Sequence, residues 1–287
     1  MPEGHKTHFI ALEHGQRLRG QFLRVTSPQG RFRSDARKVS GRELRSVQAF
    51  GKHLFYTFDG GQDRGDDLSR LSNRSADLDR SADLDRIVHV HLGRFGKFRQ
   101  HDSPPPTPVG KVRMRMIGPQ VSLDLSGPST CRVINADQRD AVLAKLGPDP
   151  LSGAKEVDVW NRVSTNPKPI AAILLDQSVV AGIGNIFRAE ALFEVGLDPR
   201  VAGQDLSRDS FRKLWRSIVR MMKVGLKHGR IITVTAKEAG EPLAKLDNQQ
   251  RFRIYQKTDC PDCGGMIETI EIAARKLYWC GRCQTDR

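Results

Sequence analysis

The sequence lacks several features that would direct a chain to a membrane. It has no run of 18 apolar residues and no amphipathic Lys/Arg helix with an aromatic face. Its first residues do not show the pattern of a secretory signal peptide. Cysteine is also scarce, with five in 287 residues, and nothing in its use calls for an oxidising compartment. We therefore expect a soluble cytoplasmic protein.

Basic residues outnumber acidic ones, giving a net charge of +14 and an isoelectric point near 9.9. Residues 59–86 hold eight Asp and five Arg, so the rest of the chain carries 42 basic and 25 acidic residues, or +17. A charge of this size predicts a polyanionic partner such as a nucleic acid.

Four of the five cysteines form two Cys-x-x-Cys pairs near the C-terminus. Cys260 and Cys263 are separated by 16 residues from Cys280 and Cys283. This spacing is typical of one tetrahedral Zn²⁺ site at a β-hairpin, and four thiolates leave no open position for catalysis. Unligated thiols would leave a segment of under about forty residues with too little apolar surface to fold. The fifth, Cys131, is expected to be a small core residue.

The first part of the chain reads as antiparallel β-structure. A short helix is expected over residues 5–14, ending near Gly15. Alternating, turn-bounded apolar runs then predict a sandwich or barrel, with strands at Phe22–Thr26, Val47–Phe50, Leu54–Phe58, Ile87–Leu92, Val112–Ile117 and Val121–Leu125. Between two of these runs, Gly60–Arg86 contains a tandem Arg-Ser-Ala-Asp-Leu-Asp repeat and is expected to be a disordered surface loop.

From about residue 137 the apolar period becomes helical. The expected helices are Asp137–Leu146, Val157–Val163, Ile170–Val180, Ile186–Val195 and Ser207–Lys227. Ala181–Asn185 reads Ala-Gly-Ile-Gly-Asn between two of them, so its backbone N–H groups and the Asn185 amide are expected to converge as a phosphate-binding nest. A plain helical hairpin is the alternative. We predict an α+β fold: an N-terminal two-layer β-sandwich (1–130, with the 60–86 insert), a helical domain with a helix–two-turn–helix (131–250) and a zinc-finger β-hairpin (251–287).

Several motifs along the whole chain resemble the formamidopyrimidine-DNA glycosylase / endonuclease VIII family of base-excision repair enzymes. They are Met1-Pro2-Glu3-Gly4, Gly51-Lys52-His53-Leu54, His91-Leu92-Gly93-Arg94-Phe95-Gly96, Leu146-Gly147-Pro148-Asp149, Leu174-Leu175-Asp176-Gln177, Ala181-Gly182-Ile183-Gly184-Asn185 and Arg275-Lys276-Leu277-Tyr278-Trp279-Cys280. The resemblance implies a bifunctional DNA glycosylase and AP lyase, acting on double-stranded DNA with oxidised bases or abasic sites, as a monomer with one structural zinc.

The resemblance also implies a mechanism. After removal of Met1, the secondary amine of Pro2 would attack the sugar C1′ and form a Schiff base, because an α-amine has a far lower pKa than lysine. Glu3 would protonate the ribose ring oxygen. Lys52 would act on the phosphate beside the lesion and in proton transfer, and Arg275 would hold that phosphate with its two-pronged guanidinium.

Further residues are expected at the DNA by the same resemblance: His91, Gly93, Arg94, Phe95, Lys145 and Asn185, in addition to Arg275. A flipped lesion leaves a gap in the duplex that side chains must fill. The purine-specific branch fills it with a Met and a later Arg-Phe pair. This chain has Arg94 and Phe95 in the first place and lacks the later pair, so Phe95 is the candidate stacking residue. Ordinary packing of Phe95 in the sheet is the alternative.

Three features favour the bacterial endonuclease VIII branch, which acts mainly on oxidised pyrimidines: Gly4, the missing Arg-Phe loop and the Leu-Tyr-Trp-Cys end of the finger. A purine-specific formamidopyrimidine (8-oxoguanine) glycosylase is the alternative within the family. A non-enzymatic zinc-finger nucleic-acid-binding protein is the alternative from another class, since such proteins reuse both zinc ribbons and helical phosphate grips. We expect the protein to work on DNA in the bacterial nucleoid.

Overall fold

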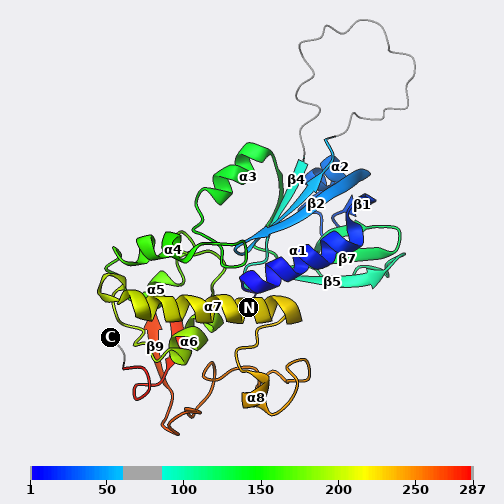
Figure 1. Cartoon of the computed structure of the whole chain (residues 1–287). Coiled ribbons are helices and arrows are strands. Elements are labelled where there is room, and N and C mark those ends of the chain that lie inside the picture. Colours follow the sequence, from blue (N-terminus) through cyan, green and yellow to red (C-terminus); the bar gives the residue numbers. More distant parts are fainter. Residues whose placement is uncertain (1, 61–85, 286–287) are drawn as a thin grey trace, which may run out of the picture. The chain divides into compact units, whose positions relative to one another are not determined.

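The computed structural model describes residues 2–60 and 86–285 (Figure 1). The predicted repeat insert falls, apart from its ends, outside these residues. The chain splits into two compact units. Among the described residues, unit 1 comprises Pro2, Ala11–Ala49 and His53–Leu143, and unit 2 comprises Glu3–Ile10, Phe50–Lys52 and the chain from Ala144 onward. Within the described ranges, no helix is long and apolar enough to cross a membrane.

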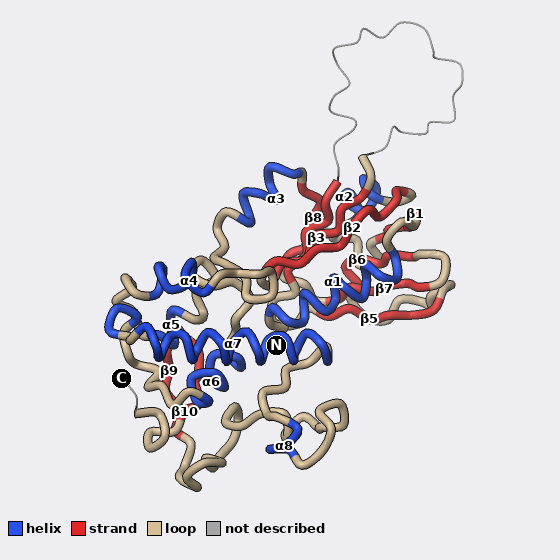
Figure 2. The backbone as a smooth tube through the Cα atoms, viewed as in Figure 1, coloured by secondary structure: helices blue, strands red, loops and turns tan. Residues whose placement is uncertain are grey.

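Unit 1 is built on antiparallel strands in the order β5-β7-β6-β1-β2-β3-β4-β8. They are β1 (Phe22–Thr26), β2 (Arg42–Phe50), β3 (His53–Phe58), β4 (Arg86–His91), β5 (Lys97–Asp102), β6 (Val112–Ile117), β7 (Val121–Ser126) and β8 (Thr130–Ile134). β1 pairs with β6 at three residues and with β2 at only two, so the sheet bends there into two layers, β5-β7-β6-β1 and β2-β3-β4-β8 (Figure 2). The predicted sandwich is confirmed.

The core of unit 1 comes from the alternation that predicted its strands. Leu23, Leu44, Tyr56, Val88 and Met114 are fully buried. The helices α1 (Gly4–Leu18), α2 (Arg33–Val39) and α3 (Ala136–Leu143) complete the secondary structure around the strands, and α1 continues from unit 2 into unit 1.

Three elements of unit 1 were not predicted. β5 (Lys-Phe-Arg-Gln-His-Asp) and α2 are too polar to show an apolar period, and β8 is short and only partly buried. β5 and β8 are the two edge strands, and each is held in the sheet by hydrogen bonds to one neighbouring strand. This pairing does not require an alternating apolar pattern. The prediction that the first helix ends near Gly15 is wrong: it runs on to Leu18, whose fully buried side chain outweighs the modest cost of a helical glycine.

Unit 2 is mainly helical. Its elements are α4 (Glu156–Val163), α5 (Ile170–Ile173), α6 (Asn185–Glu194), the 3₁₀ turn η1 (Gly203–Asp205), α7 (Arg208–His228), α8 (Ala236–Ala239) and the hairpin β9 (Glu268–Ile272) and β10 (Arg275–Trp279). α7 is the expected long amphipathic helix. The Ser207 hydroxyl accepts the N–H of Ser210 at its start, and Gly229, with φ of +64°, ends it in the left-handed conformation.

One helix in unit 2 is much shorter than predicted. The segment Ile170–Val180 is helical only over α5, and turns follow as far as Gly184. The side chain of Gln177 holds these turns, because its Oε1 accepts the N–H of Gly182 at 3.0 Å and its Nε2 donates to the carbonyl of Ile183 at 3.1 Å. Side-chain hydrogen bonds of this kind carry no apolar period, so the pattern could not show where the helix ends.

Candidate functional site

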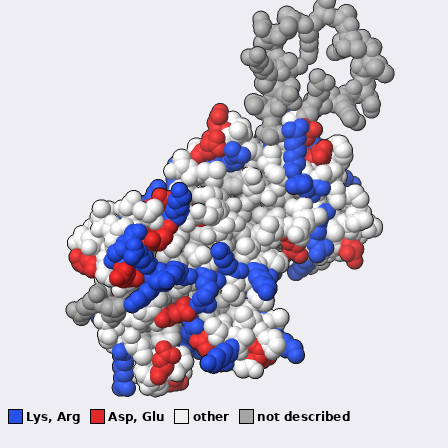
Figure 3. Space-filling model, viewed as in Figure 1, with Lys and Arg blue, Asp and Glu red and all other residues white. Residues whose placement is uncertain are grey.

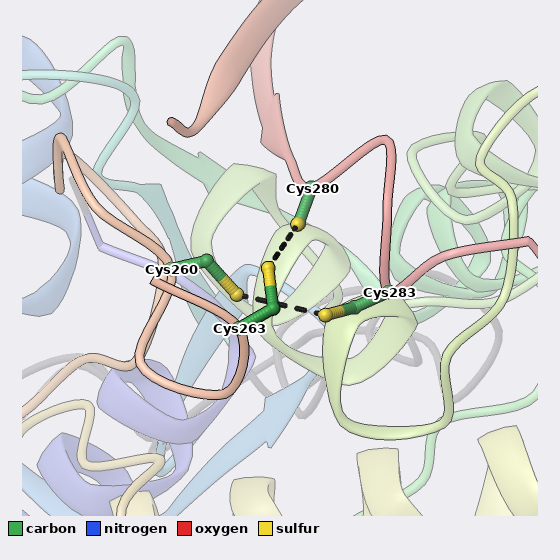
Figure 4. A group of neighbouring side chains, drawn as sticks. All are labelled: Cys260, Cys263, Cys280 and Cys283. Carbon is green, nitrogen blue, oxygen red and sulfur yellow. Dashed lines mark hydrogen bonds between the residues drawn. The ribbon is translucent and has the colours of Figure 1, made fainter. Parts of the chain in front are cut away.

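The four paired cysteines converge at one point, as predicted (Figure 4). Their sulfur atoms lie within 4.8 Å of one another, with Cys260 Sγ 3.8 Å from Cys283 Sγ and Cys263 Sγ 3.6 Å from Cys280 Sγ. A tetrahedral zinc with bonds of about 2.3 Å needs S···S edges of about 3.8 Å. The geometry therefore fits one structural Zn²⁺, and the ion would hold the segments before β9 and after β10 together.

The carboxylate of Glu3 lies on the N-terminus of α6. It is fully buried and accepts backbone N–H groups from Gly184 at 2.9 Å, Ile186 at 2.9 Å and Phe187 at 3.4 Å. The prediction of a phosphate-binding nest at this turn is thus wrong for the backbone donors. A carboxylate of the chain itself takes the anion position that the helix N-terminus favours. Glycine at 184 is required by this contact, because a Cβ there would lie 2.4 Å from the Glu3 carboxyl carbon.

Lys52 lies beside Glu3. Its Nζ donates a 2.6 Å hydrogen bond to the carbonyl of Ile183, in the same turn that receives Glu3. Burial raises the pKa of Glu3, against the opposing effects of the Lys52 charge and the backbone donors. Burial also lowers the pKa of Lys52, against the attraction of Glu3. The pKa values of both groups are thus shifted toward their neutral forms.

Asp149 fixes the turn that carries Lys52. Its Oδ2 accepts the N–H of Gly51 at 2.6 Å and the Nε2–H of His8 at 2.7 Å, and its Oδ1 accepts the N–H of Leu151 at 2.8 Å. The carboxylate is buried and fully hydrogen-bonded. It therefore ties α1 and the Gly51-Lys52 turn to the Leu-Gly-Pro-Asp segment.

Asn185 and Arg275 are connected through a buried arginine. The guanidinium of Arg188, with no exposed surface, donates to Asn185 Oδ1 at 2.5 Å and to the carbonyls of Ile272 and Arg275 at 3.2 and 3.5 Å. The Asn185 amide donates to the carbonyl of Lys276 at 2.9 Å. Arg188 thus grips both ends of the tight turn between β9 and β10. Burial lowers its pKa to about 10, so it stays charged at neutral pH.

A second buried charge in α6 anchors the segment before the zinc finger. The Glu190 carboxylate accepts the backbone N–H groups of Arg253 at 2.9 Å, Ile254 at 3.0 Å and Tyr255 at 2.7 Å, and the hydroxyl of Thr233 at 2.5 Å. One carboxylate therefore fixes three consecutive residues of the linker to the finger.

Of the remaining predicted site residues, Pro2, His91 and Gly93 belong to unit 1 and Lys145 to unit 2. Pro2 is half-buried and directly precedes Glu3 in the chain, and Lys145 is exposed in unit 2. His91 and Gly93 lie at the end of β4, where His91 Nδ1 hydrogen-bonds to Ser129 Oγ at 2.8 Å and accepts the Gly93 N–H at 3.1 Å.

The two candidate gap-filling residues are exposed in unit 1. Phe95 keeps 75% of its surface, with the Arg94 guanidinium carbon 5.5 Å from the centre of its ring. The alternative that Phe95 is an ordinary packing residue of the sheet is therefore excluded. An exposed aromatic ring of this kind is available to a ligand.

Sequence reasoning missed the positioning roles of Asp149, Arg188 and Glu190. A usable signal exists for two of them. α6 reads Asn-Ile-Phe-Arg-Ala-Glu-Ala-Leu-Phe-Glu and is buried over almost its whole length. Charged residues inside an apolar helix must be paired, so Arg188 and Glu190 mark buried contacts.

Comparisons with known proteins agree with this geometry. A family model described as the formamidopyrimidine-DNA glycosylase H2TH domain matches residues 146–237, and the zinc finger found in FPG and IleRS matches residues 260–285. Endonuclease 8 1 of Mycobacterium tuberculosis (strain H37Rv) is 38% identical over 99% of this chain and 100% of its own. A formamidopyrimidine-DNA glycosylase of Thermomicrobium roseum is 31% identical over 87% of this chain and 84% of its own.

The fold is also that of a solved structure. The Lactococcus lactis Fpg in complex with abasic-site DNA matches with a TM-score of 0.76, covering 99% of this chain and 100% of that one at 23% identity. The whole-chain identity to Endonuclease 8 1 goes further than fold. The chain belongs to the formamidopyrimidine-DNA glycosylase / endonuclease VIII family.

Proposed function

We propose that this protein is a bifunctional DNA glycosylase and AP lyase of base excision repair that removes oxidised bases, mainly pyrimidines. The observation that carries the proposal is the Glu3 carboxyl group, which is buried on the N-terminus of α6, has a raised pKa and directly follows Pro2. A carboxyl group held in this way keeps its proton to higher pH than an exposed glutamate does, as a proton donor requires. A purely DNA-binding protein has no use for it.

The reaction uses the Pro2 amine once Met1 has been removed. The amine nitrogen forms a bond to C1′ of the damaged nucleotide, and the C1′–N bond to the base breaks with its electron pair on the leaving base. Glu3 gives its proton to the ribose ring oxygen, so the ring opens and an iminium forms between Pro2 and C1′. The Pro2 nitrogen loses its N–H proton to solvent before the iminium forms, and the departing base takes up a proton from solvent.

The iminium then serves as an electron sink for strand cleavage. Loss of the C2′ proton lets the C3′–O bond break and releases the 3′ phosphate by β-elimination, and a second elimination releases the 5′ phosphate. Lys52 is placed to accept and return protons because burial lowers its pKa beside Glu3. Arg275 and Asn185, both held by Arg188, would bind the phosphate flanking the lesion, with His91 and Lys145 as further backbone contacts.

The pyrimidine preference is supported by two features. The full-length relative at 38% identity is named an endonuclease 8. In this chain the turn between β7 and β8 consists of Gly127, Pro128 and Ser129, so it has no Arg-Phe pair to fill the duplex. The exposed Phe95, with Gly93 and Arg94 beside it, would stack in the gap instead. We expect the protein to act as a monomer on DNA of the nucleoid.

Borohydride trapping on a duplex with one abasic site tests the chemistry. The untagged protein should form a covalent adduct. A chain with a non-removable N-terminal extension should form none, because its Pro2 nitrogen is an amide, and Pro2→Gly should form far less. No adduct with the untagged protein, or an equal adduct with the extended chain, refutes the lyase proposal and favours a binding protein. A panel of oxidised bases separates the branches, since strong release of 8-oxoguanine opposite cytosine counts against the pyrimidine preference.

A further inference from the structure

The exposed face of α7 carries a continuous line of basic residues, here called the α7 stripe: Arg212, Lys213, Arg216, Arg220, Lys223 and Lys227. At 100° per residue these six positions fall within an arc of about 100°, over a length of about 22 Å. Figure 3 shows a band of Lys and Arg over the place of this helix in Figure 1. The only acidic residue of α7 is Asp209, in its first turn.

Much of this charge has no ion-pair partner among the described residues. Arg212 pairs with Asp209 and Arg220 with Glu194. Within the described part of the chain, no ion pair is found for Arg216, Lys213, Lys223 or Lys227. Like charges this close repel one another, so an anionic ligand would be bound favourably. Charge alone is also typical of a solvated helix face, and a second feature is needed to indicate a binding site.

That second feature is a hollow in the middle of the stripe, here called the α7 hollow. It is lined by Trp215 and Val219 together with Arg216, Arg220 and Lys223. Trp215 is almost entirely buried and stacks on Phe211 with ring centres 6.5 Å apart, while Val219 is half-buried. The hollow thus has a rigid apolar floor and a rim of three cations. A solvated basic helix face does not require an apolar floor of this kind.

The stripe faces away from the candidate active site. The other side of α7 packs into the core of unit 2, where Met222 lies against the turn at Gly182, the residue whose carbonyl accepts the Gly4 N–H. The positions of the stripe lie about 180° round the helix from this buried side. DNA bound by Asn185 and Arg275 therefore has no need of the stripe, and a separate ligand is free to use it.

We propose that the α7 hollow and stripe bind an acidic peptide segment of a partner protein that carries one large apolar side chain. The apolar side chain enters the hollow, and the flanking carboxylates pair with Arg216 and Lys223. A stripe of about 22 Å accommodates about seven residues of extended peptide. A phosphodiester backbone would match the charge but would place nothing apolar in the hollow, so the peptide is the better fit. This proposal does not depend on the glycosylase chemistry.

Synthetic peptides test the proposal directly. The probes are fluorescein-labelled ten-residue peptides of Asp and Glu with one central Phe, Leu or Trp, and a matched peptide with a central Ala. Binding to the full-length, zinc-loaded protein is read by fluorescence anisotropy. The apolar peptides should bind about tenfold more tightly than the Ala peptide, because each buries one apolar side chain. Arg216→Glu with Lys223→Glu should weaken that binding by about tenfold or more, and added salt should weaken it further.

Controls separate the site from net charge and from misfolding. Lys237→Glu with Lys245→Glu changes the net charge equally at exposed positions off the stripe and should leave peptide binding unchanged. Val219→Asp should abolish the preference for the apolar peptide. Incision of an abasic duplex should be unaffected in all three variants. Thermal melting should be unaffected in the two charge reversals and lower in Val219→Asp, because Val219 packs against the core of unit 2.

Two results would overturn the proposal. One is equal binding of the Ala and apolar peptides, or binding that survives the stripe reversal. The other is loss of affinity for an undamaged duplex on stripe reversal with no preference for an apolar peptide, which would make the α7 stripe a DNA surface.

Discussion

The carboxylate of Asp149 accepts the backbone N–H of Gly51 at 2.6 Å, and so a residue that carries no chemistry sets the position of Lys52. The same carboxylate also accepts His8 and Leu151, which leaves neither oxygen without a donor. An acceptor with this many donors cannot be replaced by an amide. Asparagine has one acceptor atom, and its NH₂ group would face either the Gly51 or the Leu151 N–H.

Asp149→Asn is therefore expected to destabilise the protein by about 1–3 kcal/mol, the cost of a buried donor left unsatisfied. It should also slow single-turnover strand cleavage by about tenfold or more, because Lys52 loses its fixed position. Thermal unfolding and quenched-flow cleavage of an abasic duplex measure the two effects. His8→Ala, which removes one donor and leaves the Gly51 bond, is the milder control. Cleavage at the wild-type rate in Asp149→Asn would show that the bond to Gly51 does not position Lys52.

Arg188→Met is expected to loosen the turn between β9 and β10. The variant removes a buried charge that satisfies Asn185 Oδ1 and the carbonyls of Ile272 and Arg275. The turn residues Ala273 and Ala274 have φ of 55° and 53°, a conformation that costs an L-residue about 1–2 kcal/mol and needs support. We expect duplex affinity to fall about tenfold through Arg275, with the four-cysteine zinc content unchanged. Unchanged affinity would mean that the hairpin holds its shape without Arg188.

The pH dependence of base release should report on Glu3. Its pKa is raised by burial, so the protonated form persists to higher pH than in an exposed glutamate and is lost as pH rises through the raised value. Base excision should thus decline on the alkaline side, and Glu3→Gln should reduce it by about 10²–10⁴-fold and remove the decline. Cleavage of a preformed abasic site, which needs no base departure, should be reduced much less. An alkaline decline unchanged in Glu3→Gln would assign it to another group.

The same shift has a consequence for stability. Because the folded state holds the Glu3 proton more tightly than the unfolded state, Glu3 favours folding below the unfolded pKa of about 4.3. That contribution is lost as pH rises from there through the raised folded pKa. The difference in unfolding free energy between wild type and Glu3→Gln should therefore shift in favour of the variant as pH rises through this window, as measured by urea denaturation at several pH values.

The parts of this protein that follow a period or a spacing could be read from the sequence. The alternation at Leu54–Phe58 predicts β3, the apolar face of Phe211, Leu214 and Ile218 predicts α7, and the Cys-x-x-Cys spacing predicts the zinc site. These features are local. The strand β5 could not be predicted, because its place at a sheet edge comes from pairing with β7, whose partner residues lie 19 to 29 positions away along the chain.

The position of Glu3 likewise combines local features, which the sequence shows, with a long-range contact, which it does not. The sequence places the acid Glu3 after Pro2 and a glycine turn at 182–184. It cannot show that the Glu3 carboxylate binds the backbone of this turn, because the contact joins residues 181 positions apart. From the sequence alone the acid and the turn are interpreted separately, and the turn is predicted to bind a phosphate. The Glu3 carboxylate binds the N-terminus of α6 in preference to a phosphate. It belongs to the same chain and therefore loses no translational freedom on binding.

Phe95→Ala should separate binding of damaged DNA from binding of undamaged DNA. The ring is 75% exposed and has no structural role to lose, so stability should change by less than about 0.5 kcal/mol. If Phe95 fills the gap left by a flipped base, affinity for a duplex with a stable abasic analogue should fall by about 1–3 kcal/mol, while affinity for the intact duplex stays the same. Gel-shift titrations on the two duplexes measure this. Equal losses on both would make Phe95 a general contact.

Removal of zinc should abolish binding of the DNA duplex and leave the Pro2 amine reactive. The metal joins Cys260 and Cys263 to Cys280 and Cys283, and without it the two segments that flank the hairpin carrying Arg275 are no longer cross-linked. Chelation should therefore abolish tight duplex binding and incision, and both should return with added Zn²⁺. Glu3 and Pro2 lie at the other end of the chain, so the Pro2 amine should still be trapped on a small aldehyde by cyanoborohydride, as read by mass spectrometry. Full incision by the chelated protein would show that zinc does not present Arg275 to DNA.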